Sequence, residues 1–428
     1  MNNPPEMTRE ELTLFYENAK AWYLACKDKN MKLDMSRGKP SVSQLNLSNG
    51  LLNLPVNPED CLSDGIEARN YGTLAGLPAC RRLFAELLGV DADNVFVGGN
   101  ASLTLMYDII AKAHTHGLLN SSAPWSKLNK VKFICPAPGY DRHFAICASF
   151  GMEMIPVPML NSGPDMDMVE ELVMDPDVKG IWCVPKFSNP DGIVYSDETI
   201  GRIAALKPAA PDFIIMWDNA YCVHEFSGEY YSIPDILSLC KMAGRPHMAF
   251  EFSSTSKITF PGAGVSCFAC SAENMEYMKH LMSVQSISYD KINQLRHVLF
   301  FGSKEGVIKH MQKHAAILRP KFDLVCDMLD KYILPYGIGS YHRPAGGYFV
   351  SLYTLPGCAR RTHRLCAEAG VTLTNAGATY PYGRDPEDSN LRIAPSFPPL
   401  DELSAAMEAL CSALCLAAAE KLMGEPKQ

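Results

Sequence analysis

Short apolar runs alternate with amphipathic stretches over the first two thirds of the chain. Six of these runs are bounded by turn-forming residues and are short enough to be strands buried on both faces. They cover residues 95–98, 131–135, 154–158, 180–184, 213–217 and 247–252. Helix-compatible sequence lies between most of them. The pattern therefore predicts an α/β fold with a largely parallel sheet and helices on both of its faces.

The rest of the pattern is mainly helical. Residues 8–28 begin with the capping-box spacing of Thr8 and Glu11 and continue with helical periodicity. Three further stretches have helical character, namely 78–88, 273–332 with a break near Gly302, and 400–422. A strand is expected in the segment 346–352, after the two glycines with which the segment begins.

This distribution predicts two domains. We expect a large domain over residues 51–300 and a smaller α/β domain formed by 1–50 together with 301–428. The small domain would be discontinuous because the N-terminal helix is expected to fold back onto the C-terminal part. A chain of 428 residues is long enough for both.

Composition narrows the classes of partner. The chain is 47% hydrophobic and 20% charged, with a formal net charge of −8 and no block of Lys and Arg, so nucleic acid and anionic membranes are not expected as partners. We find neither a secretory signal nor an apolar run of the roughly 18 residues that a membrane span needs. The 15 cysteines are scattered, and the single CxxC, Cys267 to Cys270, has no second pair or histidine at zinc-site spacing nearby. This predicts buried free thiols, no metal and a cytoplasmic location.

Candidate chemistry follows the ends of the predicted strands, where open parallel sheets bind their ligands. Lys257 stands in a run of hydroxyl and small residues just after the last strand. A lysine there can lose enough proton affinity through burial to attack a carbonyl group. The alternative is an ordinary solvated surface lysine.

Other loops carry candidate ligands, each with a simpler structural alternative. Ser102 opens a helix where backbone N–H groups can hold a phosphate, or it merely caps that helix. Tyr140 can stack on a planar ligand or belong to the core. Asn189 can donate to a ligand oxygen or only shape its Asn-Pro turn. Asp218 can pair with a protonated ring nitrogen or cap the next element, and Arg392 can clamp a carboxylate or form a structural ion pair.

The order of these signals is more specific than any one of them. A turn with a hydroxyl, an aromatic residue, Asn-Pro-x-Gly, Asp-x-x-Tyr, Ser-x-x-Lys and Leu-Arg-Ile follow one another over about three hundred residues. The chain thereby resembles fold-type I pyridoxal-phosphate (PLP) aminotransferases of the aspartate aminotransferase superfamily over nearly its whole length. The segments at 36–40, 71–76 and 255–264 look most similar to the MocR-like, or type Ic, subgroup.

The resemblance implies a fold and a set of roles. The large domain would hold a mostly parallel sheet of the seven-stranded type between helices. Lys257 would bond to the PLP aldehyde and later move the proton between the substrate Cα and the cofactor. Asp218 would pair with the pyridine nitrogen, Asn189 and Tyr221 would hold the phenolic oxygen, and Tyr140 would stack on the ring.

The resemblance also implies how phosphate and substrate are bound. The phosphate would lie against Asn100, Ala101, Ser102, Ser254 and Ser256. Tyr71 would reach the phosphate of a second copy of the chain, so the enzyme would be a homodimer with shared active sites. Arg392 would clamp the substrate α-carboxylate, assisted by Gly38 and Asn189.

Two cations of the predicted site cannot be assigned to a single residue. Relatives carry a phosphate-binding arginine shortly after the lysine, whereas Val265 stands in the matching stretch here. Hydroxyls and a helix terminus would then suffice, or Lys291 or Arg296 would supply the cation. A dicarboxylic substrate needs one more cation, and the conceivable ones are Arg37, Lys39, Arg142, Lys186 and Arg343.

The predicted reaction is transamination, with L-aspartate and 2-oxoglutarate as the amino-acid and 2-oxo-acid substrates. An aminotransferase for another amino acid, or a PLP-dependent lyase or decarboxylase on the same fold, is the alternative. The effector domain of a transcription regulator would require a basic helix-turn-helix segment, but the residues before the sheet domain are mildly acidic at their start. A non-catalytic binding protein would not need Lys257, Asp218 and Arg392 together.

Overall fold

An eight-stranded sheet, in the order β4-β11-β10-β9-β8-β5-β6-β7, forms the centre of the computed structural model, which describes residues 7–424. Its strands in chain order are β4 (Val95–Val97), β5 (Lys132–Ala137), β6 (Glu153–Leu160), β7 (Gly163–Pro164), β8 (Val178–Cys183), β9 (Ile214–Asp218), β10 (Ala249–Ser254) and β11 (Ser266–Ala269). All six strands predicted from the apolar runs are confirmed.

The sheet is parallel in its middle and antiparallel at both edges. Strands β6, β5, β8, β9 and β10 pair in parallel, whereas β11 runs antiparallel to both β10 and β4. Two-residue β7 returns antiparallel to β6 and adds an eighth strand to the seven that were expected. The carboxyl ends of the parallel strands therefore share one edge, as a ligand site there requires.

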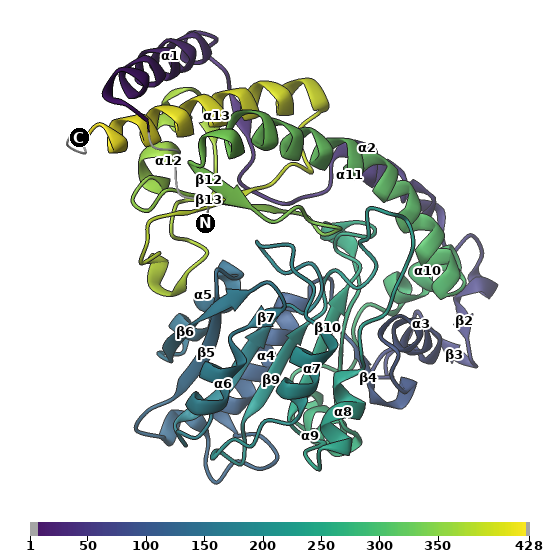
Figure 1. The fold of residues 1–428 in the computed structure, drawn as a ribbon. Helices are drawn as coiled ribbons and strands as arrows, with labels where there is room; N and C mark the ends of the chain where they lie inside the picture. Colours follow the sequence, from purple (N-terminus) through teal and green to yellow (C-terminus); the bar gives the residue numbers. More distant parts are fainter. Residues whose placement is uncertain (1–6, 425–428) are drawn as a thin grey trace.

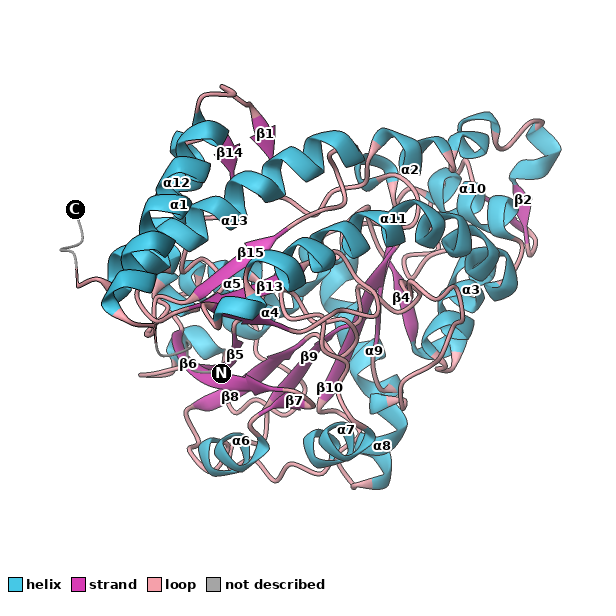
Figure 2. Ribbon diagram, turned by 45° about the horizontal axis from the view of Figure 1, so that its top comes forward, coloured by secondary structure: helices cyan, strands magenta, loops and turns pink. Residues whose placement is uncertain are grey.

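Helices cover both faces of this sheet (Figure 2). They are α3 (Pro78–Leu88), α4 (Ser102–Thr115), α5 (Asp141–Ser149), α6 (Met166–Leu172), α7 (Asp197–Ala204), α8 (Ile236–Met242), α9 (Ala272–Ser283) and α10 (Lys291–Phe301). Side chains of β9 alternate between the two layers, because Ile215 and Trp217 join the core with α6, α7 and α8, and Ile214 and Met216 join the core with α4, α5 and α9. Burial on both faces explains why these strands are continuously apolar.

A second unit packs above the carboxyl edge of the sheet (Figure 1). Its helices are α1 (Arg9–Lys27), α2 (Val42–Asn46), α11 (Lys304–Tyr332), α12 (Ala359–Glu368) and α13 (Leu400–Leu422). Its strands are β1 (Leu33–Asp34), paired with β14 (Val371–Thr372), and the sheet β12 (Gly339–Tyr341), β13 (Val350–Thr354) and β15 (Asn390–Ile393). A separate hairpin, β2 (Leu62–Ser63) with β3 (Ile66–Glu67), lies beside α3 (Figure 1).

The N-terminal helix lies against the C-terminal one. Trp22 Nε1 donates to Glu408 at 3.3 Å, and the Lys29 ammonium pairs with the same carboxylate at 2.6 Å. Lys27 forms a second ion pair with Glu368 of α12 at 2.9 Å. The predicted helix at 8–28 is thus confirmed, and its packing agrees with a discontinuous small domain, although the domain boundaries themselves remain a prediction.

Two other predicted elements differ from what the structure shows. The strand expected at 346–352 begins only at Val350, because Gly346 instead bridges to Glu225 of another loop. The helical stretch at 273–332 has its predicted break at Gly302, whose φ of +70° suits a glycine, and a further break separates α9 from α10.

Among the described residues, α13 is long and apolar enough to cross a membrane by length and composition alone. However, 78% of its most apolar window is buried inside the protein, where it packs on α1, α11 and α12. A helix that is apolar on all sides is expected at such a position in a core.

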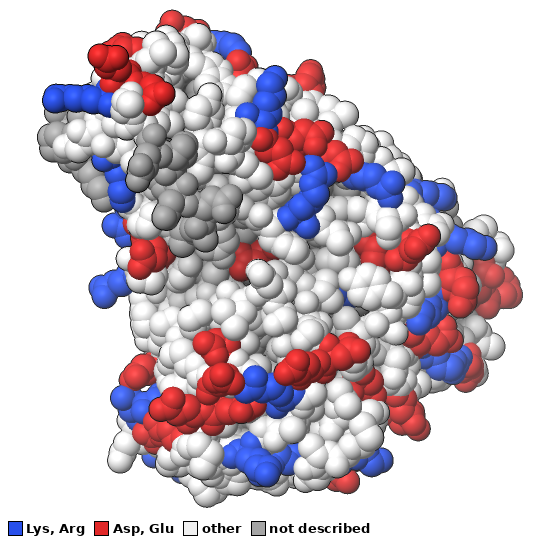
Figure 3. All heavy atoms as spheres, in the orientation of Figure 1, with Lys and Arg blue, Asp and Glu red and all other residues white. Residues whose placement is uncertain are grey.

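All 15 cysteines lie among the described residues, and each is buried as a free thiol, which confirms that prediction. Acidic and basic side chains are interspersed over the face seen in Figure 3. This face therefore presents both signs of charge rather than a single basic field.

Candidate active site

Lys257 lies one turn beyond the carboxyl end of β10, at the floor of a cavity of about 510 Å³ between the two units. Its ammonium nitrogen is 4.9 Å from the centre of the Tyr221 ring and 5.9 Å from that of Tyr348, and no described residue forms a hydrogen bond or ion pair with it. Burial lowers the pKa of this amine, an effect that the charge of Asp218 opposes. This shift raises the share of the neutral amine, the form that attacks a carbonyl, above that of an exposed lysine.

A buried polar chain holds the backbone around this lysine. The Tyr348 hydroxyl donates to the carbonyl of Lys257 at 3.4 Å, and Gln44 Nε2 donates to that hydroxyl at 2.9 Å. His310 Nε2 donates to the carbonyl of Ile258 at 2.9 Å. These contacts tie α2, α11 and the segment before β13 to the lysine turn, so both units position the reactive group.

Asp218 ends β9 and faces the same cavity, with one oxygen paired and one free. Its Oδ2 lies 3.1 Å from Nε2 of His143 on α5, whereas Oδ1 is buried and lacks a hydrogen-bond partner among the described residues. The His143 ring stacks on Trp182 with a centroid distance of 4.3 Å. An unpaired buried carboxylate oxygen is costly unless a donor meets it, and a protonated ligand nitrogen would be such a donor.

Three further predicted residues surround Lys257 and Asp218. Tyr140 precedes α5 and Tyr221 follows β9, and both line the cavity. Burial raises the pKa of Tyr140 to about 12 and that of Tyr221 well above its usual value, so both keep a hydroxyl that can donate. Asn189 accepts from Arg392 at 3.2 Å through Oδ1, which leaves its amide nitrogen to face a ligand.

Arg392 on β15 is 8% exposed and forms the opposite wall of the cavity. Its guanidinium donates to Asp141 at 2.9 Å and to the Thr374 hydroxyl at 3.3 Å, and it lies over the Phe349 ring at 4.8 Å. Gly38 lines the same wall, where a Cβ atom would come within 2.6 Å of Phe349. A larger residue at this position would force the Phe349 ring to move.

The five predicted phosphate-binding residues gather at the start of α4. Ser254 donates to Ser256 at 3.1 Å, Ser256 donates to the carbonyl of Asn100 at 3.1 Å, and Asn100 donates to the carbonyl of Pro261 at 3.2 Å. Ala101 occupies the N-cap of α4 without a side-chain cap, and Ser102 is its first residue. The free backbone N–H groups of a helix start suit an anion.

The cations considered in place of the missing arginine have other partners. Val265 is buried, and its N–H donates to Thr255 at 2.9 Å. Lys291 holds the carbonyls of Asn70 and Gly72, at 2.5 and 2.9 Å, and Arg296 holds that of Leu54 at 2.6 Å. Lys291 thereby fixes the loop that presents Tyr71, whose side chain is 82% exposed in the single chain.

The cations considered for a second substrate carboxylate differ in their surroundings, because some line the cavity and others are engaged elsewhere. Arg37 and Arg142 line the cavity. Lys39 lies over the Phe397 ring at 3.9 Å, and Arg343 pairs with Asp323, Asp327 and Asp330 on α11.

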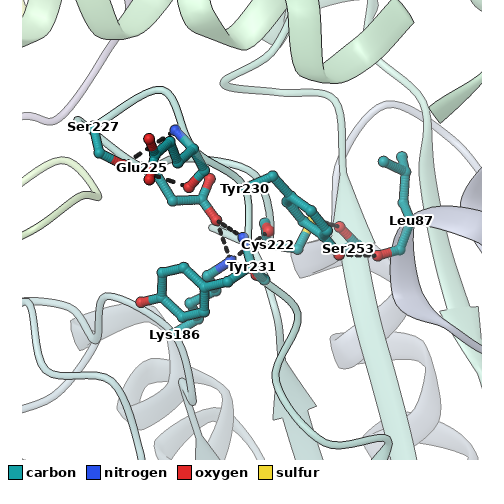
Figure 4. Close-up of polar contacts among 9 residues, drawn as sticks. Leu87, Lys186, Cys222, Glu225, Ser227, Tyr230, Tyr231 and Ser253 are labelled. Atoms are coloured by element: carbon teal, nitrogen blue, oxygen red, sulfur yellow. Dashed lines mark hydrogen bonds and ion pairs between the residues drawn. The ribbon is translucent and has the colours of Figure 1, made fainter. Parts of the chain in front are cut away.

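Lys186 is held in a separate cluster. It is 1% exposed, pairs with Glu225, and donates to the carbonyls of Cys222 at 2.9 Å and Tyr231 at 2.5 Å (Figure 4). Its charge is therefore already neutralised away from the cavity, which leaves Arg37 and Arg142 of the five.

Another buried carboxylate lies within the sheet, on the strand beside β9 and opposite Trp217. Glu251 on β10 accepts from Asn219 at 2.9 Å, and burial raises its pKa to about 8 from 4.5. Between these two values the folded protein binds a proton that the unfolded chain has lost, so this group makes stability fall as the pH rises from 4.5 to 8.

Replacing Glu251 with glutamine should remove this pH dependence, because the amide keeps an acceptor for Asn219 and does not titrate. We expect wild-type stability to lose up to about 1.4 kcal/mol per pH unit more than the variant across this interval. Chemical unfolding at several pH values measures this difference. The exposed Glu276→Gln variant serves as control, and parallel curves for wild type and Glu251→Gln would contradict the assignment.

Several functional residues were not found from the sequence. They are Asp141, His143, Thr374, Phe349 and the pair Gln44 and Tyr348. The only sequence signal for the first two is their position in the helix start that follows Tyr140. Nothing in the sequence marks the others as neighbours of Lys257 or Arg392.

An amine after one strand end, a carboxylate at the end of the neighbouring strand and a guanidinium from a second unit are, on this fold, the groups that an aminotransferase would use. The profile of the family described as aspartate amino-transferase matches residues 7–426. The chain belongs to this family, and it is an aminotransferase.

Comparison with individual proteins supports this family assignment. The aspartate aminotransferase of Corynebacterium glutamicum is 48% identical over 411 residues, which are 96% of this chain and 95% of that protein. The crystal structure of an aspartate transaminase from the same organism has a TM-score of 0.95 at 47% identity, covering 97% of this chain and 98% of that one. An α-aminoadipate aminotransferase of Thermus thermophilus shares the fold, with a TM-score of 0.73 at 20% identity, over 95% and 98% of the two chains.

Proposed function

We propose that the protein uses pyridoxal 5'-phosphate to transfer the amino group of L-aspartate to 2-oxoglutarate, which yields oxaloacetate and L-glutamate. One observation carries the proposal. The Lys257 amine, the unpaired Oδ1 of Asp218 and the Arg392 guanidinium all face one cavity of about 510 Å³.

The residues of this cavity suit the cofactor. When bound, PLP supplies an aldehyde that captures an amino group and a ring that accepts electron density. Asp218 Oδ1 would accept a hydrogen bond from the protonated ring nitrogen, Tyr221 and the Asn189 amide would donate to the phenolic oxygen, and Tyr140 would stack on the ring. The phosphate would meet the start of α4 together with the hydroxyls of Ser254 and Ser256.

The phosphate needs no arginine in this arrangement. Asn100, Ala101 and Ser102 present the N-terminus of a 14-residue helix, whose dipole favours an anion. We infer that hydroxyls and helix dipole do the work of the arginine that Val265 replaces, because Lys291 and Arg296 are engaged with backbone carbonyls.

Substrate selection follows from the three arginines of the cavity. Arg392 would bind the α-carboxylate beside Gly38 and Asn189, and Arg37 or Arg142 would bind the second carboxylate of a dicarboxylic substrate. Lys257 would then take the proton from the substrate Cα and deliver it to the carbon that carried the aldehyde. The name of the 48% identical relative favours aspartate as the donor.

We also infer that the active site is shared within a homodimer. Tyr71 is a large, exposed side chain on a loop that Lys291 fixes by two hydrogen bonds. Such an ordered exposed aromatic residue suits a contact with a second copy, where its hydroxyl would reach the phosphate. The assignments to the MocR-like, type Ic subgroup and to the cytoplasm are likewise proposals, based on the sequence motifs and on the free buried thiols.

The visible absorption spectrum of the PLP-loaded protein tests the function. Adding L-aspartate should shift the band of the lysine-bound cofactor to that of the pyridoxamine form, and 2-oxoglutarate should restore it. L-Alanine and L-leucine, which lack the second carboxylate, serve as controls. At equal concentration they should convert the band at a rate at least about tenfold lower than that with L-aspartate. A band that ignores aspartate but responds to another amino acid would overturn the substrate, and loss of CO₂ instead of amino transfer would identify a decarboxylase.

A further inference from the structure

Asp141 is the only charged partner of the Arg392 guanidinium among the described residues. It begins α5, and its Oδ1 lies 2.9 Å from Nη1 of Arg392. The Arg392 side chain is 7% exposed, whereas that of Asp141 is 33% exposed and borders the cavity. The ion pair thus joins a buried cation to an anion that water can reach.

Three of the other four N–H groups of this guanidinium also have partners among the described residues. Nη1 also donates to Asn189 at 3.2 Å, while Nη2 and Nε donate to the Thr374 hydroxyl at 3.3 and 3.4 Å. A carboxylate that binds Arg392 through two parallel hydrogen bonds needs one whole edge of the guanidinium. If it uses the edge formed by the two terminal nitrogens, it needs an N–H of Nη1, and both N–H groups of Nη1 are already held by Asp141 and Asn189.

We propose that Asp141 is a displaceable counter-ion for Arg392, which the substrate α-carboxylate replaces on binding and which reclaims the guanidinium when product leaves. This inference rests on the proposed function, in which Arg392 binds the α-carboxylate. It assigns Asp141 a role in setting affinity for every carboxylate ligand.

The charge of Arg392 explains why the site keeps Asp141, although this carboxylate competes with the substrate for the guanidinium. A buried guanidinium without a counter-ion is strongly unfavourable, so Asp141 stabilises Arg392 while substrate is absent. Asp141 would also be stable away from Arg392, because its side chain is partly exposed and the start of α5 favours a negative charge. Its displacement therefore costs less than leaving Arg392 unpaired.

The variant Asp141→Asn tests the inference, since its amide oxygen can still accept from Arg392 but carries no charge. Calorimetric titration of the PLP-loaded protein with maleate, a dicarboxylate without an amino group, measures binding without turnover. We expect the Kd to fall about three- to fivefold, which is the range for a partly exposed ion pair. The gain should shrink in high salt, because screening weakens the competition.

Two further variants separate the possible failures. Thr374→Val removes an uncharged contact of the same guanidinium and should not tighten binding. Arg392→Gln should abolish maleate binding, and if it does not, the proposed site for the α-carboxylate is wrong. If Arg392→Gln abolishes binding but Asp141→Asn leaves the Kd unchanged or weakens it, the counter-ion role alone is overturned.

Thermal unfolding gives an independent measure that also reports folding of the variant. Asp141→Asn should lower the Tm of the ligand-free protein, because Arg392 then lacks its counter-ion. Saturating maleate should raise the Tm of this variant by more than it raises that of the wild type. An equal rise in both proteins would contradict the displacement of Asp141.

Discussion

Lys257→Ala is expected to abolish turnover, with kcat reduced by at least about 10⁴-fold. The amine is the only group at the cavity floor that combines a lowered pKa with freedom from hydrogen-bond and ion-pair partners in the part of the chain that the structure describes. Alanine removes both its bond to the cofactor and its proton transfer at the substrate Cα. Steady-state assay of oxaloacetate formation measures the loss, and turnover within about tenfold of wild type would refute the mechanism.

The same variant can test whether the active site is shared between two chains. Lys257→Ala and Tyr71→Ala would each be inactive or weak alone, because each lacks one part of every site. Refolding or co-expressing the two together forms mixed dimers, in which one site receives both intact residues and the other receives neither. We expect activity to return toward half of the wild-type value in each mixed dimer. No recovery, with mixed dimers shown by mass, would place Tyr71 outside the partner's site.

The sequence was sufficient to predict the location of those site residues that directly follow a recognisable strand. Asp218 and Lys257 could be assigned to one edge of the sheet because each follows a buried apolar run, and the carboxyl ends of parallel strands meet there. The start of α4 was predictable for the same reason. These inferences need only local pattern and the rule for ligand sites in open sheets.

Residues whose role depends on a distant partner were beyond this reasoning. Asp141 contacts Arg392 across 251 positions and His143 contacts Asp218 across 75, so no local pattern reveals either pair. The same limit applies to Lys186. By residue type it is as good a candidate cation as Arg142, and only its tertiary contact with Glu225 neutralises its charge. Which cations remain free for substrate is decided by tertiary contacts, not by residue type.

Asp218→Asn is expected to reduce kcat by about 10³-fold while the protein still folds and binds the cofactor. The side chain keeps its size and its contact with His143, so the change is confined to charge. The buried Oδ1 of aspartate has no described donor, and in our proposal it holds a protonated ring nitrogen. An amide cannot balance that positive charge in a site removed from water, so the ring would lose its proton and much of its capacity to accept electrons.

The matched variant His143→Gln separates the effect of the Asp218 charge from the effect of the orientation of its carboxylate. Glutamine removes the imidazole that holds Oδ2 at 3.1 Å and its stacking on Trp182, yet it leaves the Asp218 carboxylate intact. Its effect on kcat should be smaller than that of Asp218→Asn, because a misaligned carboxylate still favours the protonated ring. The absorption band of the bound cofactor, followed against pH, distinguishes the two variants, since only Asp218→Asn should change the protonation state of the ring near neutral pH. Equal losses in kcat with unchanged spectra would mean that Asp218 acts through packing, and its electrostatic role would be wrong.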